Sequence, residues 1–345
     1  MEINYPYRKQ TKLNTFKINL TKISKSYYKQ YKEQVQMNIG VIGYGHMGSM
    51  IVENILKLEL LFDDEKLIVS NRNIEKIQHL KEEYEELDVE ITEDNTELAS
   101  KCEKIIIAVE TPQFKDLLNE IKPFLKENCH IIYTCSGLEF ENVEKIHDGK
   151  FSMIIPTYAS TVSSSNSIAS QNRRKGVTLI KHNSKVGFEE QKYIEDLFNE
   201  FSYVKKFEEF NMDMENPFNY TRDLNNFSMN NDIEVSTIIT SCAPAFIAIL
   251  IEKLASIASM KSGIPKNEME QMITKTVLAT ASLKDDYNLS NEEIISQVAT
   301  KGGITQEGVD FLNKNMDRIY EKLIYQSISR FNEVKMELDE EYSKE

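Results

Sequence analysis

The sequence predicts an α/β protein in which a doubly wound parallel sheet is followed by an all-α region. Between Met37 and Phe207, short apolar segments alternate with amphipathic helical segments, whereas beyond residue 232 the periodicity is helical only. A glycine-rich turn stands directly after the first apolar segment. With 345 residues, the chain is long enough for two domains that each have a core.

The glycine-rich turn has the pattern of a dinucleotide-binding site. Residues 37–42 are expected to form a buried strand, and a helical pattern begins after the turn. In a Rossmann-type unit the first glycine makes the turn, the second admits a pyrophosphate, and the third packs the helix on the strand. The candidate cofactor residues are therefore Gly43, Gly45, His46, Met47 and Gly48.

The end of the second predicted strand, 67–70, indicates which dinucleotide binds. An acidic residue at this place would bind the ribose 2′-hydroxyl of NAD, but the chain has Ser70, Asn71 and Arg72. These side chains can neutralise and hydrogen-bond a 2′-phosphate. We therefore expect NADPH as the cofactor and NADH as the second choice; the alternative is that Arg72 is an ordinary solvated loop residue.

The other amino-terminal elements continue the alternation. Ligands of such sheets bind at the carboxyl ends of the strands, here residues 109–112, 135–137 and 156–157. The further strands are expected at 89–91, 104–109, 130–134, 151–155, 177–181 and 203–207. Helices are expected to begin at Thr96 and to span 113–124 and 189–201. The amino-terminal domain is accordingly placed at 37–207.

A polar stretch, 208–231, is expected to be a linker or insertion before a helical domain at 232–336. Thr240 or Ser241 is the expected N-cap of its first helix, with Pro244 in the first turn. Residues 245–260 are apolar on every side but too few and too interrupted by charge to span a bilayer, so we expect a partner subunit to cover them. The helices are expected at 241–262, 266–283, 291–298 with Ser290 as cap, and about 306–336, before a charged tail, 337–345, that frays.

Composition narrows the class of protein. A net charge of −14 disfavours a nucleic-acid partner, and no secretory or spanning segment is recognisable, so a cytoplasmic protein without a membrane partner is expected. The four cysteines lack CxxC spacing, which favours reduced, buried thiols and no metal site. Residues 1–36 hold eight Lys or Arg and two Glu. They are interpreted as a disordered leader, or as sequence upstream of a true start at Met37, rather than as a transit peptide.

A turn with two glycines and two threonines precedes the last predicted helix, in the segment Ala299–Gln306. Its free backbone amides and hydroxyls can form an anion nest that suits a carboxylate. The alternative is an ordinary interhelix turn with Thr305 as N-cap, and the spacing alone favours this alternative.

Taken together, these motifs resemble the pyrroline-5-carboxylate reductase family. Its Ser-Gly-Ser-Gly-Pro-Ala-Tyr and Pro-Gly-Gly-(Thr/Ala)-Thr patterns are similar to Thr240–Phe246 and Lys301–Thr305. The amino half agrees in 42–47, 69–72, 93–95 and 108–109. The likeness covers about residues 37–328 without the 208–231 stretch.

The resemblance implies a fold, an activity and site residues. It implies NADPH-dependent reduction of a cyclic imino acid to proline, by homodimers interlocked through the helical domain or by higher oligomers. The NADP adenosine end would be held by Ser70, Asn71, Arg72 and Asn95, with Ala108, Val109 and Pro156 at strand ends nearby. The substrate would be held by Thr300, Gly302, Gly303 and Thr305, and Thr305 is the candidate catalytic residue that hydrogen-bonds the imine nitrogen.

Several residues depart from the family pattern. A cofactor-side lysine is replaced by Glu110, and the Met-Pro-Asn-Thr-Pro motif reads Ile155-Pro-Thr-Tyr-Ala159, which changes positions Thr157, Tyr158 and Ala159. The departures are similar to those of the late-competence homologues of spore-forming bacteria. Two alternatives therefore stay open: reduction of another imine or oxo acid, and a non-catalytic dinucleotide-binding regulator.

Overall fold

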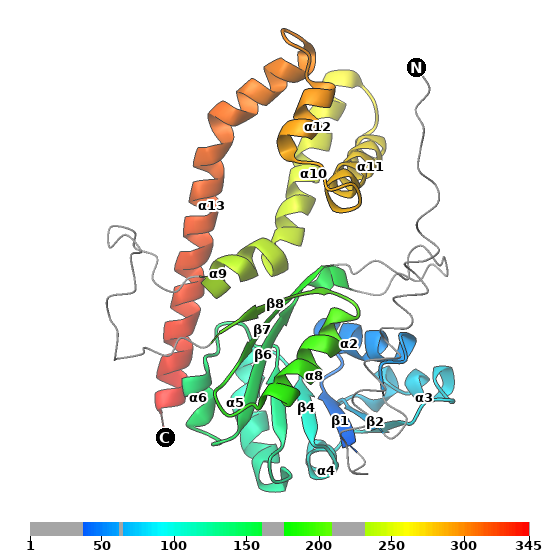
Figure 1. Cartoon of the computed structure of the whole chain (residues 1–345), viewed down its shortest axis with the longest axis vertical. Helices are drawn as coiled ribbons and strands as arrows, with labels where there is room; N and C mark the ends of the chain where they lie inside the picture. The colour runs from blue at the N-terminus through cyan, green and yellow to red at the C-terminus, as the bar shows by residue number, and fades with distance from the viewer. Residues whose placement is uncertain (1–36, 62–64, 161–175, 209–231, 345) are drawn as a thin grey trace. The chain divides into compact units, whose positions relative to one another are not determined.

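The computed structural model describes residues 37–61, 65–160, 176–208 and 232–344 (Figure 1). The leader at 1–36 and nearly all of the polar stretch predicted at 208–231 lie outside the described residues. The chain divides into two compact units. Within the described ranges, the first comprises 37–109 and 117–132 and the second comprises 110–116 and 133–344.

Eight strands form one sheet in the order β3-β2-β1-β4-β5-β6-β7-β8. The strands are β1 (Met37–Ile42), β2 (Glu65–Ser70), β3 (Val89–Thr92), β4 (Lys104–Ile107), β5 (His130–Tyr133), β6 (Lys150–Pro156), β7 (Val177–His182) and β8 (Tyr203–Phe207). Each lies where the apolar pattern predicts a strand, which confirms the α/β class.

The expectation of a wholly parallel sheet is wrong at one pair. β1 pairs in parallel with β2 and β4, β2 with β3, and β7 with β8, but β6 and β7 are antiparallel, with Ser152 opposite His182. A parallel pair needs a crossover element between its strands. Among the described residues between β6 and β7, only the single turn η3 (Tyr158–Ser160) is present.

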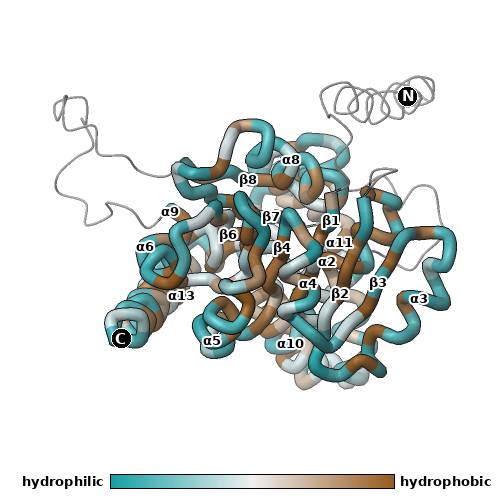
Figure 2. Tube along the Cα trace, turned by 90° about the horizontal axis from the view of Figure 1, so that it is seen from below, coloured by the Kyte–Doolittle hydropathy of each residue, from teal (hydrophilic) through white to brown (hydrophobic). Residues whose placement is uncertain are grey.

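The first unit buries the apolar strands under short helices. In Figure 2 the tube of β2 is largely hydrophobic and that of α3 (His79–Glu83) largely hydrophilic. Ile39, Val41 and Leu67 are at most 1% exposed. The remaining elements of this unit are α2 (His46–Lys57), η1 (Ile74–Lys76), α4 (Asn95–Lys101) and η2 (Lys122–Phe124), and α5 (Thr111–Ile121) is shared with the second unit.

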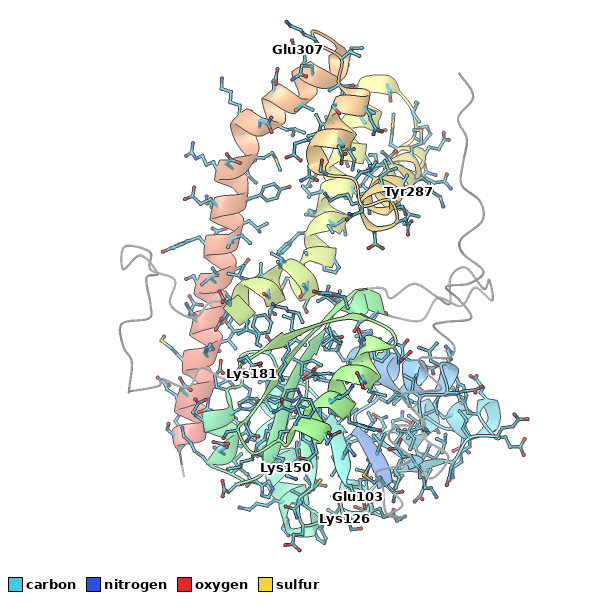
Figure 3. The ribbon with its side chains drawn as sticks, in the orientation of Figure 1. Glu103, Lys126, Lys150, Lys181, Tyr287 and Glu307 are labelled. Carbon is cyan, nitrogen blue, oxygen red and sulfur yellow. The ribbon has the colours of Figure 1, made fainter. Side chains whose placement is uncertain are left out.

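Ion pairs close the amino-terminal edge of the strands in the first unit. The Glu103 carboxylate accepts a hydrogen bond from the Asn38 backbone N–H at 2.6 Å and another from Lys126 Nζ at 2.6 Å (Figure 3). Because this edge is occupied by its own side chains, the opposite, carboxyl-terminal edge is the one left for a ligand.

The strand layer of the second unit has a core of its own. The Tyr133 ring lies between those of Phe114 and Phe140, with ring centroids 5.3 Å and 6.2 Å away. Helices α6 (Phe140–Glu144) and α8 (Phe188–Asn199) contribute to this layer. Cys135 is buried, as are Cys102 and Cys129 of the first unit, but Cys242 is exposed, so the expectation of buried thiols is wrong for that one cysteine.

The helical layer of the second unit follows with α9 (Asp232–Thr237), the π-helical segment η4 (Ile238–Cys242), α10 (Ala243–Ser262), α11 (Lys266–Asp285), α12 (Asn291–Val298) and α13 (Ile304–Ser343). Ser290 caps α12 as predicted, accepting the Glu293 backbone N–H at 3.1 Å. The first helix is longer than predicted. Neither Thr240 nor Ser241 caps it, because both lie inside η4 and the helix already begins at Asp232.

The run Asp232–Ser262 therefore has 31 residues. Among the described helices it is the one long and apolar enough, by length and composition, to cross a membrane, so the argument that it is too short is wrong. A core helix passes the same test. Only 17% of its most apolar window is buried within one chain. Its apolar surface thus needs a cover from outside the chain.

Helix α13 is also longer than predicted. It is one continuous helix of 40 residues (Figure 1) and continues to Ser343, through the tail that was expected to fray. Leu338 and Tyr342 are each 5% exposed. The Asn142 side-chain amide donates to Asp339 Oδ1 at 2.8 Å, and Lys115 Nζ donates to the Glu341 carbonyl at 2.6 Å. The many charged residues of this segment led to the prediction of fraying, although Leu338 and Tyr342, four residues apart, lie on one face of the helix and are buried.

Candidate functional site

The three turn glycines meet three different steric requirements. Gly43 has φ +97°, and a Cβ there would lie 2.6 Å from the Ala108 carbonyl oxygen, so both conformation and space require glycine. A Cβ at Gly48 would overlap the Gly43 carbonyl. Among the residues that the structure describes, no heavy atom lies within 4 Å of the corresponding point at Gly45, so this glycine leaves space that a pyrophosphate can enter.

The α2 amino terminus adds to this cradle. His46 is exposed and is the first residue of α2, and Met47 is half-buried beside it. Gly45, the N-cap of this helix, has no side chain that could accept the first-turn N–H groups, which an α-helix leaves without an intrahelical acceptor. Such a terminus favours an anion.

The structure brings the predicted adenosine-end residues together at the end of β2. The Ser70 hydroxyl donates to Asn95 Oδ1 at 2.7 Å, and the Asn71 Oδ1 atom accepts the Tyr44 backbone N–H at 3.2 Å. Asn95 is the first residue of α4, whose N-cap is Asp94. Arg72 is exposed, so its guanidinium is accessible to a phosphate.

The remaining predicted cofactor residues are placed as follows. Ala108 is buried and its backbone N–H donates to the Ile42 carbonyl at 2.8 Å, which fixes the loop after β4 against the glycine turn. Val109 is half-buried at the end of that loop. Pro156 ends β6 and is buried in the second unit.

A polar network behind the glycine turn was missed by sequence reasoning. The Glu53 carboxylate of α2 accepts hydrogen bonds from the hydroxyls of Tyr44 at 2.8 Å and Tyr84 at 3.1 Å, and pairs with Lys57 at 2.8 Å. His79 Nε2 lies 3.4 Å from the Tyr44 hydroxyl. The side chain of the turn residue Tyr44 is thus tied back to the helix. The spacing of Tyr44 and Glu53 in the sequence gave no signal for this contact.

The pKa values of the network follow from burial and these bonds. Burial, together with the hydrogen bond to Glu53, raises the pKa of Tyr44 well above its usual value. Burial alone would raise the pKa of Glu53, but the hydrogen bonds from Lys57 and Tyr44 outweigh it and lower that pKa. The carboxylate is therefore charged and both phenols are neutral near pH 7.

The predicted substrate turn lies between α12 and α13 in the second unit. Gly303, not Thr305, is the N-cap of α13, so Thr305 is the second helical residue and is exposed. The positive φ of the turn belongs to Gly302, at +71°. The Gly303 N–H donates to the Thr300 carbonyl at 2.9 Å, and a Cβ at Gly303 would meet the Thr300 side chain. The backbone N–H groups at this turn that lack an intrahelical acceptor are those of the first turn of α13, which begins at Ile304.

The departures from the family pattern have different environments. Glu110 is exposed, and Tyr158 is 53% exposed. Thr157 is 4% exposed, and its hydroxyl donates to the carbonyls of Val177 at 3.0 Å and Thr240 at 3.1 Å. The first two positions are open to solvent in one chain, whereas Thr157 has a defined structural role.

Apolar side chains remain exposed on the helical layer. The set includes Ile249 at 50%, Leu254 at 57%, Met260 at 77%, Ile304 at 95% and Phe311 at 66% exposure. Soluble monomers seldom expose an apolar surface of this extent, and such surfaces mark interaction sites.

Two families match the chain. The family described as "Pyrroline-5-carboxylate reductase dimerisation" matches residues 230–334, which contain the exposed apolar helices. The family described as "NADP oxidoreductase coenzyme F420-dependent" matches residues 38–133, which contain the glycine turn and the end of β2.

Similar proteins agree with these matches. A pyrroline-5-carboxylate reductase of Methanobrevibacter smithii is 36% identical over 82% of this chain and 99% of its own length. The ComE operon protein 4 of Bacillus subtilis is 23% identical over 86% of this chain and 96% of its own length. The fold is similar to that of the Plasmodium falciparum pyrroline carboxylate reductase with NADP bound, with a TM-score of 0.62 and 19% identity over 88% of this chain and 99% of that one. The chain belongs to the pyrroline-5-carboxylate reductase family.

Proposed function

We propose that this protein reduces 1-pyrroline-5-carboxylate to L-proline with NADPH in the cytoplasm. One observation carries the proposal: a chain 36% identical to a pyrroline-5-carboxylate reductase over nearly all of that enzyme keeps a complete glycine turn. The steric requirements at Gly43 and Gly48 and the open space at Gly45 support the binding of a dinucleotide at this turn.

The cofactor residues of the first unit fit NADPH. The open space at Gly45 and the uncapped amino terminus of α2 suit the pyrophosphate. Arg72 is exposed at the end of β2, where the 2′-phosphate would lie, and Ser70 and Asn95 are fixed beside it by their own hydrogen bond. When bound, NADPH supplies a hydride from its nicotinamide ring.

The protein's contribution to the reduction is positioning. A cyclic imine can arrive protonated at nitrogen, so its carbon already accepts hydride and no strong acid is required. The first-turn amides of α13 would hold the substrate carboxylate, with Thr300, Gly302 and Gly303 shaping the turn. The Thr305 hydroxyl would accept a hydrogen bond from the protonated ring nitrogen or donate one to the carboxylate. Fixing the carboxylate and excluding water then orients the imine carbon.

The active assembly is proposed to be a homodimer or a higher homo-oligomer joined through residues 232–336. The exposed apolar residues of α10 and α13 and the dimerisation match to residues 230–334 support this. A second copy also accounts for the membrane-length helix Asp232–Ser262 without a membrane.

The test is NADPH oxidation by the purified protein offered 1-pyrroline-5-carboxylate, beside a direct titration of NADPH. Proline formation with saturable kinetics supports the proposal. NADPH binding with turnover only of other imines or of 2-oxo acids would redirect the activity, and NADPH binding without any turnover would favour a regulator. Absence of NADPH binding would contradict the proposal at its first step.

The substrate turn has its own test, Thr305→Ala. Loss of one hydrogen bond to a charged or reacting group should lower kcat/KM for the imine by about 10- to 100-fold. The dissociation constant of NADPH should stay unchanged, because Thr305 belongs to the substrate set. Weaker NADPH binding with normal turnover at saturating substrate would show that the turn serves the cofactor instead.

A further inference from the structure

The helical run Asp232–Ser262 contains a proline at the junction of its π-helical and α-helical parts. Pro244 is the second residue of α10, but helical residues already precede it from Asp232. In an α-helix the carbonyl of Thr240 would accept the N–H of residue 244, which proline lacks. The proline ring also clashes with that carbonyl. The π-helical segment η4, Ile238–Cys242, widens the helix at this place and accommodates the ring.

A side chain from the sheet supplies a donor to this carbonyl. The Thr157 hydroxyl lies 3.1 Å from the Thr240 carbonyl oxygen, although the two residues are 83 positions apart. Thr157 stands directly after β6. The helical run changes direction between α9 and α10 (Figure 1), where η4 lies. The contact of Thr157 with Thr240 therefore joins the end of a strand to this bend.

Thr157 is held rigidly enough to act as a fixed donor. Its backbone N–H donates to the Val177 carbonyl at 2.8 Å, and its hydroxyl also lies 3.0 Å from that oxygen. Its carbonyl accepts the Ser160 N–H at 2.9 Å. A residue tied to β7 on one side and to η3 on the other has little freedom to move away from Thr240.

We propose that Thr157 is a positioning residue of the reductase, whose hydroxyl replaces the amide missing at Pro244 and fixes the bend of the helix. The inference rests on the proposed function for its kinetic part only. The residues after β6 are at the carboxyl end of a strand, where ligands of such sheets bind, and α10 begins within the bend. Fixing one against the other sets the direction in which α10 leaves the strand layer of the second unit.

The decisive experiment is a double-mutant cycle between Thr157→Val and Pro244→Ala. Thr157→Val keeps the shape and removes the donor, so we expect the melting temperature to fall by about 2–4 °C. We expect kcat to fall about 10-fold with the NADPH dissociation constant unchanged. Thr157→Ser keeps the hydroxyl and should restore kcat to within about 3-fold of the wild type. In the Pro244→Ala background an amide is again available to Thr240, so Thr157→Val should change the melting temperature by less than about 1 °C.

Thr178→Val is the matched control. Thr178 is a fully buried threonine of β7 whose hydroxyl lies 2.6 Å from the hydroxyl of Ser202, the residue before β8. Its loss should lower the melting temperature equally with and without Pro244→Ala. If the effect of Thr157→Val is also equal in both backgrounds, the hydroxyl serves only Val177 and the proposal is overturned.

Two further outcomes keep the test decisive. If Pro244→Ala does not fold, amide hydrogen exchange of residues 238–245 replaces the cycle, and exchange should accelerate in Thr157→Val but not in Thr157→Ser. Equal exchange in the two variants would overturn the proposal. If the wild type reduces no pyrroline-5-carboxylate, the proposed function fails, whereas the cycle in melting temperature still decides whether Thr157 holds the bend.

Discussion

The strand core of the first unit and the helical layer of the second contain similar aliphatic residues in opposite environments. Val41 and Leu67 are 0% exposed, because the chain's own helices cover the strands. Ile249 and Leu254 of the apolar helix α10 are 50% and 57% exposed. An apolar pattern therefore predicts burial without identifying the surface that covers it. The strands of the first unit are covered by the same chain, whereas the helical layer matches a dimerisation family and is proposed to be covered by a second copy.

Ile249→Asp, on the exposed apolar face of α10, should have the largest effect, because it should disrupt the oligomer. If a second copy covers α10, each subunit loses about 2 kcal/mol or more of apolar burial and must desolvate a carboxylate. Sedimentation velocity should show monomer or aggregate in place of the wild-type oligomer. Phe124→Asp is the control, since Phe124 is 48% exposed but lies in the first unit. An oligomer unaffected by Ile249→Asp would place the interface elsewhere.

The pH dependence of stability tests whether the strand layer of the second unit buries its side chains from solvent as the first unit does. His182 is 4% exposed, with Nδ1 2.6 Å from the Ser152 hydroxyl. Burial, with the Lys206 charge, lowers the pKa of His182 to about 4. The unfolded chain, with a histidine pKa of about 6.5, binds the proton first, so stability is present above about pH 6.5 and falls by about 3 kcal/mol as the pH drops to 4.

The measurement is the free energy of unfolding of the wild type and of His182→Asn between pH 7 and pH 4. The variant lacks the titrating group, so the wild type should lose its advantage over the variant across this range. Parallel curves would contradict burial of the neutral imidazole.

Arg72→Ala tests the cofactor residues of the first unit. An arginine–phosphate contact contributes about 1.5–3 kcal/mol to binding, so the variant should bind NADPH about 10- to 100-fold more weakly, while its affinity for NADH should change little. Fluorescence titration of both cofactors measures this. Lys76→Ala removes another exposed cation of the same unit and should leave the selectivity unchanged. Equal weakening of both cofactors by Arg72→Ala would refute a 2′-phosphate contact.

Tyr44→Phe should have the smallest effect. It removes the hydroxyl that joins the glycine turn to Glu53 at 2.8 Å, so both cofactors should bind about 3-fold more weakly without a change in selectivity. Tyr84→Phe removes the other phenol bonded to the same carboxylate but lies outside the turn. It should lower the melting temperature and leave cofactor affinity intact. Equal affinities in the two variants would show that the network stabilises the fold only.

The fold was predictable because its signals are local. The central strands have apolar runs, the glycines carry steric information, and Ser290 with Glu293 forms a capping box within four residues. The juxtaposition of candidate site residues at the end of β2 was predictable for the same reason, since Ser70 and Asn95 each follow a recognisable strand, and their side chains lie 2.7 Å apart; that they bind a cofactor stays a prediction.

What could not be predicted depends on contacts between distant residues. A proline near small residues is typical of a helix start, whereas in the structure helical residues precede Pro244 from Asp232 and Thr157 contacts them at Thr240. The tail after Met336 is charged and was expected to fray, because the contacts that hold it are with residues distant in the sequence: Asp339 with Asn142, and Tyr342 with Lys115. The antiparallel β7 was hidden because its apolar pattern is the same in either direction.

The 40-residue helix α13 starts at the glycine turn proposed for the substrate and ends with residues that contact other elements. The number of residues between its two ends therefore fixes the direction in which the residues near its carboxyl end point. Inserting one residue in its middle would turn everything beyond it by about 100° and shift it by about 1.5 Å. Leu338, Asp339 and Tyr342 would then face away from their present contacts if the turn stayed in place. An insertion or deletion of seven residues, about two turns, would keep this direction to within about 20°. Natural variation in the length of this helix should therefore occur in whole turns, and single-residue changes should be confined to the loops that flank it.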